Sequence, residues 1–204
     1  MANVWFSADF HFGHSNIIRY CDRPFANATE MDEAILDRVN ESVKADDGLY
    51  FLGDFCVGGP KVAVAYRQKI RCKKVYFVLG NHDVVIKKIV DQFVWSKEIA
   101  EVNIRNQPIV LCHYAMRVWH HSSRGPWQSY GHSHGKLPVD KGSRSMDVGV
   151  DTNDSACIRL KKSERSCEPS RLAAICLILR ARSLARISHE EVAKGLISWH
   201  NWFI

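Results

Sequence analysis

The stretch VWFSADFH, residues 4–11, shows the pattern that decides the fold. Its apolar beginning is followed at once by Asp9 and His11. The same pattern recurs in LYFLGD at 49–54 and in VYFVLGNHD at 75–83. Apolar runs of about 4–8 residues bounded by turn residues are typical of buried strands. We therefore predict three strands, each of which delivers polar residues at its carboxyl end.

Helical segments separate these strands. After a helix-start box at Thr29–Asp32, apolar residues recur every four positions, at Met31, Ile35, Val39 and Val43. Residues 60–70 are predicted to be a second helix, with Pro60 in its first turn, and residues 84–93 a third. Strands that alternate with helices predict a parallel sheet, and ligands bind beyond the carboxyl ends of such strands.

The second half of the chain is richer in strand patterns. Ile109–Cys112, 127–130 and 146–150 are predicted to be strands. His113 follows the first of them, and the segment GHSH, residues 131–134, follows the second.

The composition is that of a globular protein. At about 150 residues per domain, a chain of 204 residues predicts a single domain over 1–204. Hydrophobic residues make up 46% and charged residues 25% of the chain, which excludes wholesale disorder. No apolar run reaches the ~18 residues that a membrane span needs. The first residues lack the basic region of a secretory signal, so we expect a cytoplasmic protein.

The seven cysteines form no CxxC pair, and reduced thiols fit better than a disulfide framework. We expect Cys56 and Cys112 to be buried in the core.

The formal net charge of +6 is concentrated in residues 155–186, an atypical basic insertion before a last helix predicted at 188–200. Elsewhere acidic and basic residues balance, so charge does not imply nucleic-acid binding by the whole surface. Three interpretations of 155–186 are open: an ordinary insertion with a helix at 170–186, a basic interaction arm, or a poorly packed segment. We favour the first.

Metal-ligand residue types gather at the predicted strand ends. They are carboxylate, amide and imidazole groups: Asp9, His11, Asp54, Asn81, His82, His113, His132 and His134. An i, i+2 pair that leaves a strand places both side chains on one side. Oxygen and nitrogen donors suit Mn²⁺, Fe, Zn²⁺ or Mg²⁺. Eight groups are too many for one tetrahedral ion and suit two ions that share a bridge.

The order D-x-H, G-D, G-N-H-D, H and G-H-x-H resembles the calcineurin-like metallophosphoesterase superfamily. The motifs run from Asp9 to His134 and look like those of its small single-domain bacterial and phage members. The resemblance implies a four-layer α/β/β/α sandwich with mixed sheets and two divalent metal ions, Mn²⁺ favoured over Fe, Zn²⁺, Ni²⁺ or Mg²⁺.

The resemblance also implies roles for particular residues. One ion would be held by Asp9, His11 and His134, and the other by Asn81, His113 and His132, with Asp54 bridging both. A bridging hydroxide would attack phosphorus while His82 protonates the leaving group as general acid. Asp83 would orient His82 or act as a helix N-terminal acid, and His14 and Arg117 are candidate substrate contacts.

The implied substrate is a phosphate ester, and a phosphodiester is favoured over a phosphomonoester. A nucleotide or cyclic nucleotide fits a site with short loops. A nuclease acting on DNA or RNA and a non-catalytic scaffold of the same fold are the alternatives. We expect a monomer or small homo-oligomer without a membrane partner.

Overall fold

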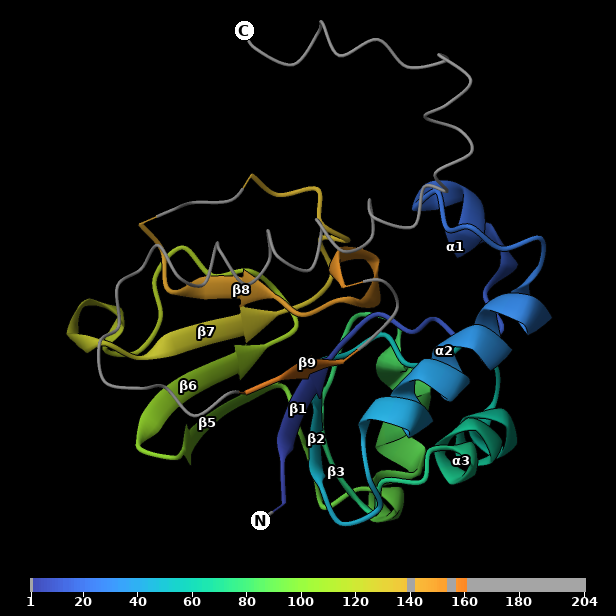
Figure 1. The fold of residues 1–204 in the computed structure, drawn as a ribbon, viewed down its shortest axis with the longest axis horizontal. Helices are drawn as coiled ribbons and strands as arrows, with labels where there is room; N and C mark the ends of the chain where they lie inside the picture. Colours follow the sequence, from blue (N-terminus) through green and yellow to red (C-terminus); the bar gives the residue numbers. More distant parts are fainter. Residues whose placement is uncertain (1, 139–141, 154–156, 161–204) are drawn as a thin grey trace, which may run out of the picture.

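The computed structural model describes residues 2–138, 142–153 and 157–160 (Figure 1). Two sheets pack face to face, and helices cover the outer side of the first sheet (Figure 1). The first sheet has the order β4-β3-β2-β1-β9. Its strands are β1 (Val4–Ser7), β2 (Gly48–Phe51), β3 (Lys74–Val78), β4 (Trp95–Lys97) and β9 (Ile158–Arg159). All neighbours are parallel except β9, which runs antiparallel to β1.

The second sheet has the order β5-β6-β7-β8. Its strands are β5 (Ile99–Ile104), β6 (Gln107–Cys112), β7 (Trp127–Tyr130) and β8 (Ser145–Asp147). β5 and β6 are antiparallel, whereas β6, β7 and β8 are parallel. The prediction of a mixed α/β fold with two mixed sheets is therefore confirmed. The helix predicted at 188–200 lies outside the described residues.

Three α-helices accompany the first sheet: α1 (Ser15–Tyr20), α2 (Ala28–Ser42) and α3 (Pro60–Lys69). The predicted apolar stripe of α2 is confirmed, since all four of its residues are buried. The start of α2 differs from the prediction. Asn27 is the N-cap and accepts from the Glu30 backbone N–H, while the Glu30 carboxylate accepts from Ala26. The capping box thus begins two residues earlier than the predicted Thr29.

The helix predicted over 84–93 is wrong. The chain forms two short 3₁₀ helices there, η1 (Asp83–Lys88) and η2 (Val90–Gln92). Val84, Val85 and Ile86 are β-branched and lose rotamer freedom in an α-helix. Two further 3₁₀ turns are η3 (Ser122–Arg124) and η4 (Val150–Thr152).

β4 and β5 were not predicted from the sequence. They are separated by Glu98 alone, and the chain passes from the first sheet to the second at this residue. β9 was also missed, and it forms the beginning of the segment 155–186. The whole helix predicted at 170–186, and the basic segment from residue 161 on, lie outside the described residues.

The core has two layers. One lies between the helices and the first sheet and contains a cluster of phenylalanines whose rings meet in tilted or edge-to-face contacts: Phe10, Phe12, Phe51, Phe55 and Phe77. The other lies between the two sheets. Cys56 and Cys112 are buried, as predicted, and the five cysteines of the described residues are free thiols. None of the helices in the described part of the chain has the length and hydropathy needed to span a bilayer.

Candidate metal centre

Five of the predicted ligands lie on backbone in the left-handed region. Their φ angles run from +48° to +66°, at Asp9, His11, Asp54, His132 and His134. The pair Asp9 and His11 therefore meets through left-handed backbone and not through strand alternation, whereas His132 and His134 contribute to two different clusters. Each such non-glycine residue costs about 1–3 kcal/mol. Conformations of this kind cluster at functional sites, where the surrounding structure holds them in place.

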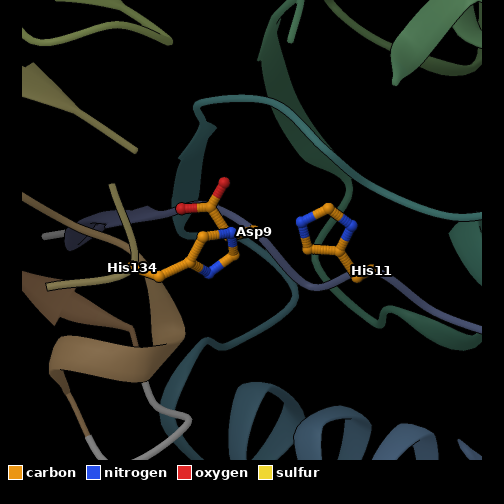
Figure 2. A group of neighbouring side chains, drawn as sticks. All are labelled: Asp9, His11 and His134. Atoms are coloured by element: carbon orange, nitrogen blue, oxygen red, sulfur yellow. The ribbon is translucent and has the colours of Figure 1, made fainter. Parts of the chain in front are cut away.

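A first cluster consists of Asp9, His11 and His134, whose ligand atoms lie within 4.8 Å of one another (Figure 2). The Asp9 carboxylate is completely buried and accepts from the His132 backbone N–H at 2.9 and 3.0 Å. Burial raises the pKa of Asp9 to about 7, although the charge of His134 acts to lower it. A Cβ atom on Gly131 would lie 2.8 Å from Asp9 Oδ2, so only glycine permits this close approach.

His11 shows directly that a cation fits the first cluster. Its Nε2 atom is buried and has no hydrogen-bond partner among the described residues. Asp54 Oδ2 lies 3.5 Å away. Burial lowers the pKa of His11 to about 3, which keeps the imidazole neutral with its lone pair free. An unpaired buried nitrogen is costly, and coordination of a metal ion would satisfy it.

A second cluster consists of Asp54, His113 and His132, again with ligand atoms within 4.8 Å of one another. His113 Nδ1 lies 2.7 Å from the Leu52 carbonyl oxygen, to which it donates. His113 Nε2 therefore faces the Asn81 Oδ1 atom at 3.1 Å and Asp54 Oδ2 at 3.5 Å. Burial opposes protonation, but the contact with Asp54 raises the pKa of His113. A positive charge is thus favourable where these acceptor atoms meet.

Asp54 lies between the two clusters. Its Oδ2 atom is 3.5 Å from the Nε2 atoms of both His11 and His113. Its Oδ1 atom accepts from the His82 backbone N–H at 2.9 Å. Burial opposes ionisation, but the hydrogen bond with His113 and neighbouring charges lower the pKa of Asp54 to about 2. One carboxylate oxygen therefore faces a ligand from each cluster.

Asp83 holds the loop that carries Asp54. Its carboxylate accepts from the backbone N–H groups of Asp54 and Gly80 at 2.7 Å and of Phe55 at 3.0 Å. In the described structure these bonds, and not a bond to the His82 ring, occupy the carboxylate. Of the two roles expected for Asp83, that of a helix N-terminal acid fits its place in the first turn of η1, and its carboxylate also supports the Asp54 and Gly80 loops.

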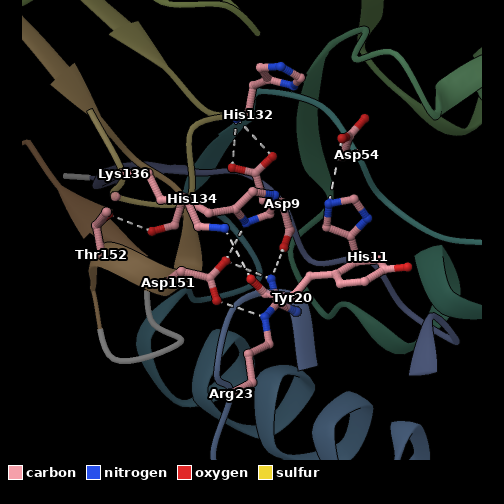
Figure 3. Close-up of polar contacts among 12 residues, drawn as sticks. Asp9, His11, Tyr20, Arg23, Asp54, His132, His134, Lys136, Asp151 and Thr152 are labelled. Atoms are coloured by element: carbon pink, nitrogen blue, oxygen red, sulfur yellow. Dashed lines mark hydrogen bonds and ion pairs between the residues drawn. The ribbon is translucent and has the colours of Figure 1, made fainter. Parts of the chain in front are cut away.

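Arg23 and Asp151 belong to the site and were missed from the sequence (Figure 3). Arg23 binds the Asp151 carboxylate through Nε and Nη2 at 2.7 and 2.8 Å. It also donates to the backbone carbonyls of Asp9 and Phe10. Asp151 Oδ2 lies 2.6 Å from His134 Nδ1. Burial opposes protonation, but the bond with Asp151 raises the pKa of His134 to about 10.

Only Asp151 offered a sequence signal. It follows the predicted strand at 146–150 as Asp9 follows the first strand. Arg23 stands in a loop without any pattern that marks it. Asp151 binds His134 Nδ1 and so orients the ring, with Nε2 toward Asp9. Arg23 connects Asp151 to the backbone carbonyls of Asp9 and Phe10.

The remaining predicted residues lie at different distances from the clusters. The His82 side chain is exposed, and its ring centroid is 5.6 Å from that of His11. His14 Nδ1 lies 3.5 Å from His11 Nδ1, so His14 adjoins the first cluster. Arg117 is exposed after β6 and makes no hydrogen bond or ion pair within the described ranges.

A family model described as calcineurin-like phosphoesterase matches residues 2–166, so the chain belongs to this family. The family implies divalent metal ions, and the unpaired His11 nitrogen and the acceptors around His113 fit such ions.

Among curated relatives, an uncharacterized protein of Methanocaldococcus jannaschii is 37% identical over 84 residues, which is 41% of this chain and 48% of that protein. The Gene 66 protein of Mycobacterium phage D29 is 32% identical over 41% of each chain. The aligned part spans less than half the length of either relative.

Among solved structures, a protein of unknown function from Aquifex aeolicus, AQ665, superposes with a TM-score of 0.61 at 19% identity. The match covers 78% of this chain and 96% of that one, and it supports the fold alone.

Proposed function

We propose that this protein is a two-metal phosphoesterase that favours phosphodiester substrates. The observation that carries the proposal is the position of Asp54 Oδ2, 3.5 Å from a histidine of each cluster. One ion would be held by Asp9, His11, Asp54 and His134. Asp54 would also bind the other ion, together with Asn81, His113 and His132.

Oxygen and nitrogen donors favour hard or borderline ions, and we propose Mn²⁺ before Fe, Zn²⁺, Ni²⁺ or Mg²⁺. Two bound ions would supply an activated water as nucleophile and offset the charge of the phosphoryl group.

The protein's own residues position the substrate and move the proton. The ring of His82 stands at the exposed edge of both clusters, while its backbone N–H is fixed on Asp54. This arrangement leaves the imidazole available as general acid for the leaving oxygen. His14, whose Nδ1 lies 3.5 Å from His11 Nδ1, adjoins the first cluster, and Arg117 is an exposed cation available to a phosphate oxygen.

The test is an assay of metal-stripped protein with and without added Mn²⁺. Bis(p-nitrophenyl) phosphate and p-nitrophenyl phosphate separate diesterase from monoesterase activity. We expect Mn²⁺-dependent cleavage with the diester preferred. A preference for the monoester would redirect the search to phosphatases, and folded, metal-loaded protein without activity on either ester would contradict the proposal.

A further inference from the structure

A cavity of about 340 Å³ is lined in part by His82. Its walls come from the loop that follows β2 and from η1, and include Val57, Pro60, His82, Val84 and Lys88. The side chains of Val57 and Val84 are 46% and 70% exposed. Isolated exposed valines are ordinary on a protein surface, but here two of them line one cavity next to the proposed general acid.

The walls of the cavity favour an apolar group of the size of a ring. Val57 and Val84 supply exposed apolar side chains to the wall. Gly59 is also part of the wall, and a Cβ atom added to it would meet nothing within 4 Å, so this position leaves space for a ligand. A volume near 340 Å³ is at the small end of ligand pockets, about 300–1,000 Å³.

The charge of the cavity favours an anion. No carboxylate lines it. Burial raises the pKa of the Cys56 thiol to about 12, so that thiol is neutral. Lys88 is exposed and makes no ion pair within the described residues. Its neighbour Lys87 lies 3.5 Å from Glu98. Lys88 therefore leaves a positive charge uncompensated at the rim.

We propose that this cavity binds the leaving portion of the substrate, and that this portion carries a flat ring and a negative charge, as a nucleotide does. The assignment rests on the proposed function, because an oxygen that His82 protonates must lie within hydrogen-bond reach of its ring. His82 borders both the metal clusters and the cavity. The leaving oxygen would lie at His82, the ring between Val57 and Val84, and the anion at Lys88.

The binding test uses full-length protein loaded with Zn²⁺ and saturated with inorganic phosphate, which occupies the metal-bound phosphoryl position. Adenosine 5′-monophosphate is titrated in and followed by methyl NMR, with adenosine and ribose 5-phosphate as partial ligands. We expect shifts confined to the valines of the cavity and weaker binding of both partial ligands.

Two substitutions test the walls. Val84→Asp should weaken binding about 10-fold, because it replaces apolar contact with a like charge. Lys88→Gln should weaken it about 2–5-fold, as expected for an exposed charge pair. The matched controls are Val90→Asp, at a valine 50% exposed outside the cavity, and Lys87→Gln. Equal losses in test and control variants, or shifts elsewhere, would overturn the assignment.

Kinetics separate this inference from the proposed function. Lys88→Gln should raise KM for a dinucleotide with a terminal phosphate more than for bis(p-nitrophenyl) phosphate, whose leaving group carries no second anion. Unchanged KM for the dinucleotide in an active enzyme would reject the leaving-group role alone. No hydrolysis of either ester by the wild type, with nucleotide binding intact, would reject the proposed function and not the ligand class.

Discussion

The two ligand clusters differ in how they are enclosed and supported. In the first cluster Asp9 and His11 are buried, and His134 is fixed by the ion-paired side chains of Asp151 and Arg23. In the second cluster His132 and Asn81 are exposed, and His113 is fixed by a backbone carbonyl.

In the proposed two-metal centre, this difference would give the two positions separate tasks. An enclosed site held by side-chain partners retains its ion, because outer partners orient the ligands and tune them. A site with exposed ligands leaves room for a substrate oxygen and exchanges its ion more readily. The four predictions below test this contrast in order of expected effect.

Asp54→Asn should have the largest effect, because Asp54 Oδ2 lies 3.5 Å from a histidine of each cluster. We expect turnover to fall by more than the about 10–100-fold typical of losing an outer-shell partner. Metal analysis should show fewer bound ions per chain. Normal activity in this variant would refute the shared-ligand model.

His82→Ala should lower kcat by about 10²–10⁴-fold, most for esters with poor leaving groups. Metal content should stay the same, because the alanine variant keeps the backbone N–H that binds Asp54. His120→Ala is the control, since His120 is exposed and paired with Glu101. A uniform loss for good and poor leaving groups would argue against a general acid.

Asp151→Asn should weaken the first cluster and spare the second. Loss of the Asp151 charge leaves His134 and Arg23 without their carboxylate partner. We therefore expect about 10–100-fold lower affinity for one of the two proposed ions. Graded chelation followed by metal analysis measures this loss. Asp91→Asn, at an exposed carboxylate in η2, should behave as the wild type. Equal weakening of both ions would contradict separate support.

Asp47→Ala should affect stability and leave both clusters intact. Asp47 accepts from the backbone of Asn3 and Lys44 and from the Trp5 indole, and these bonds outweigh its burial and lower its pKa below 3.8. A lowered pKa contributes stability above about pH 3.8 that is lost as the pH falls through the folded-state value.

The expected loss at neutral pH is about 1.5–3 kcal/mol of unfolding free energy. It should shrink below about pH 4, as measured by denaturant unfolding at several pH values. Asp46→Ala, at an exposed neighbour, is the control. A loss that does not change with pH would show that the Asp47 charge is not involved.

The sequence by itself determined the first three strands, the stripe of α2 and the residues at the strand ends. Apolar runs of strand length followed by Asp, His or Asn are local patterns, and the carboxyl ends of parallel strands necessarily meet at one edge. The family motifs have fixed order, so they too could be read without coordinates. Their family assignment is confirmed by the match over residues 2–166.

The local signals also failed in identifiable places. Thr29 resembles an N-cap, but Asn27 is the N-cap of the helix. Asn27 accepts from the Glu30 backbone N–H, and the Glu30 carboxylate in turn accepts from the Ala26 backbone N–H. The segment 84–93 resembles a helix, but its β-branched residues form 3₁₀ turns next to the Asp83 carboxylate. A reciprocal hydrogen bond decided the first case, and the low helix preference of β-branched residues decided the second.

Only the tertiary structure decided how the ligands converge. The left-handed turns at Asp9, Asp54 and His132 depend on contacts from distant segments, and Arg23 meets Asp151 across 128 positions of sequence. The passage from one sheet to the other at Glu98 and the cavity beside His82 likewise depend on packing. Periodicity reports which side of an element is buried, whereas burial of one particular nitrogen, such as His11 Nε2, depends on everything packed around it.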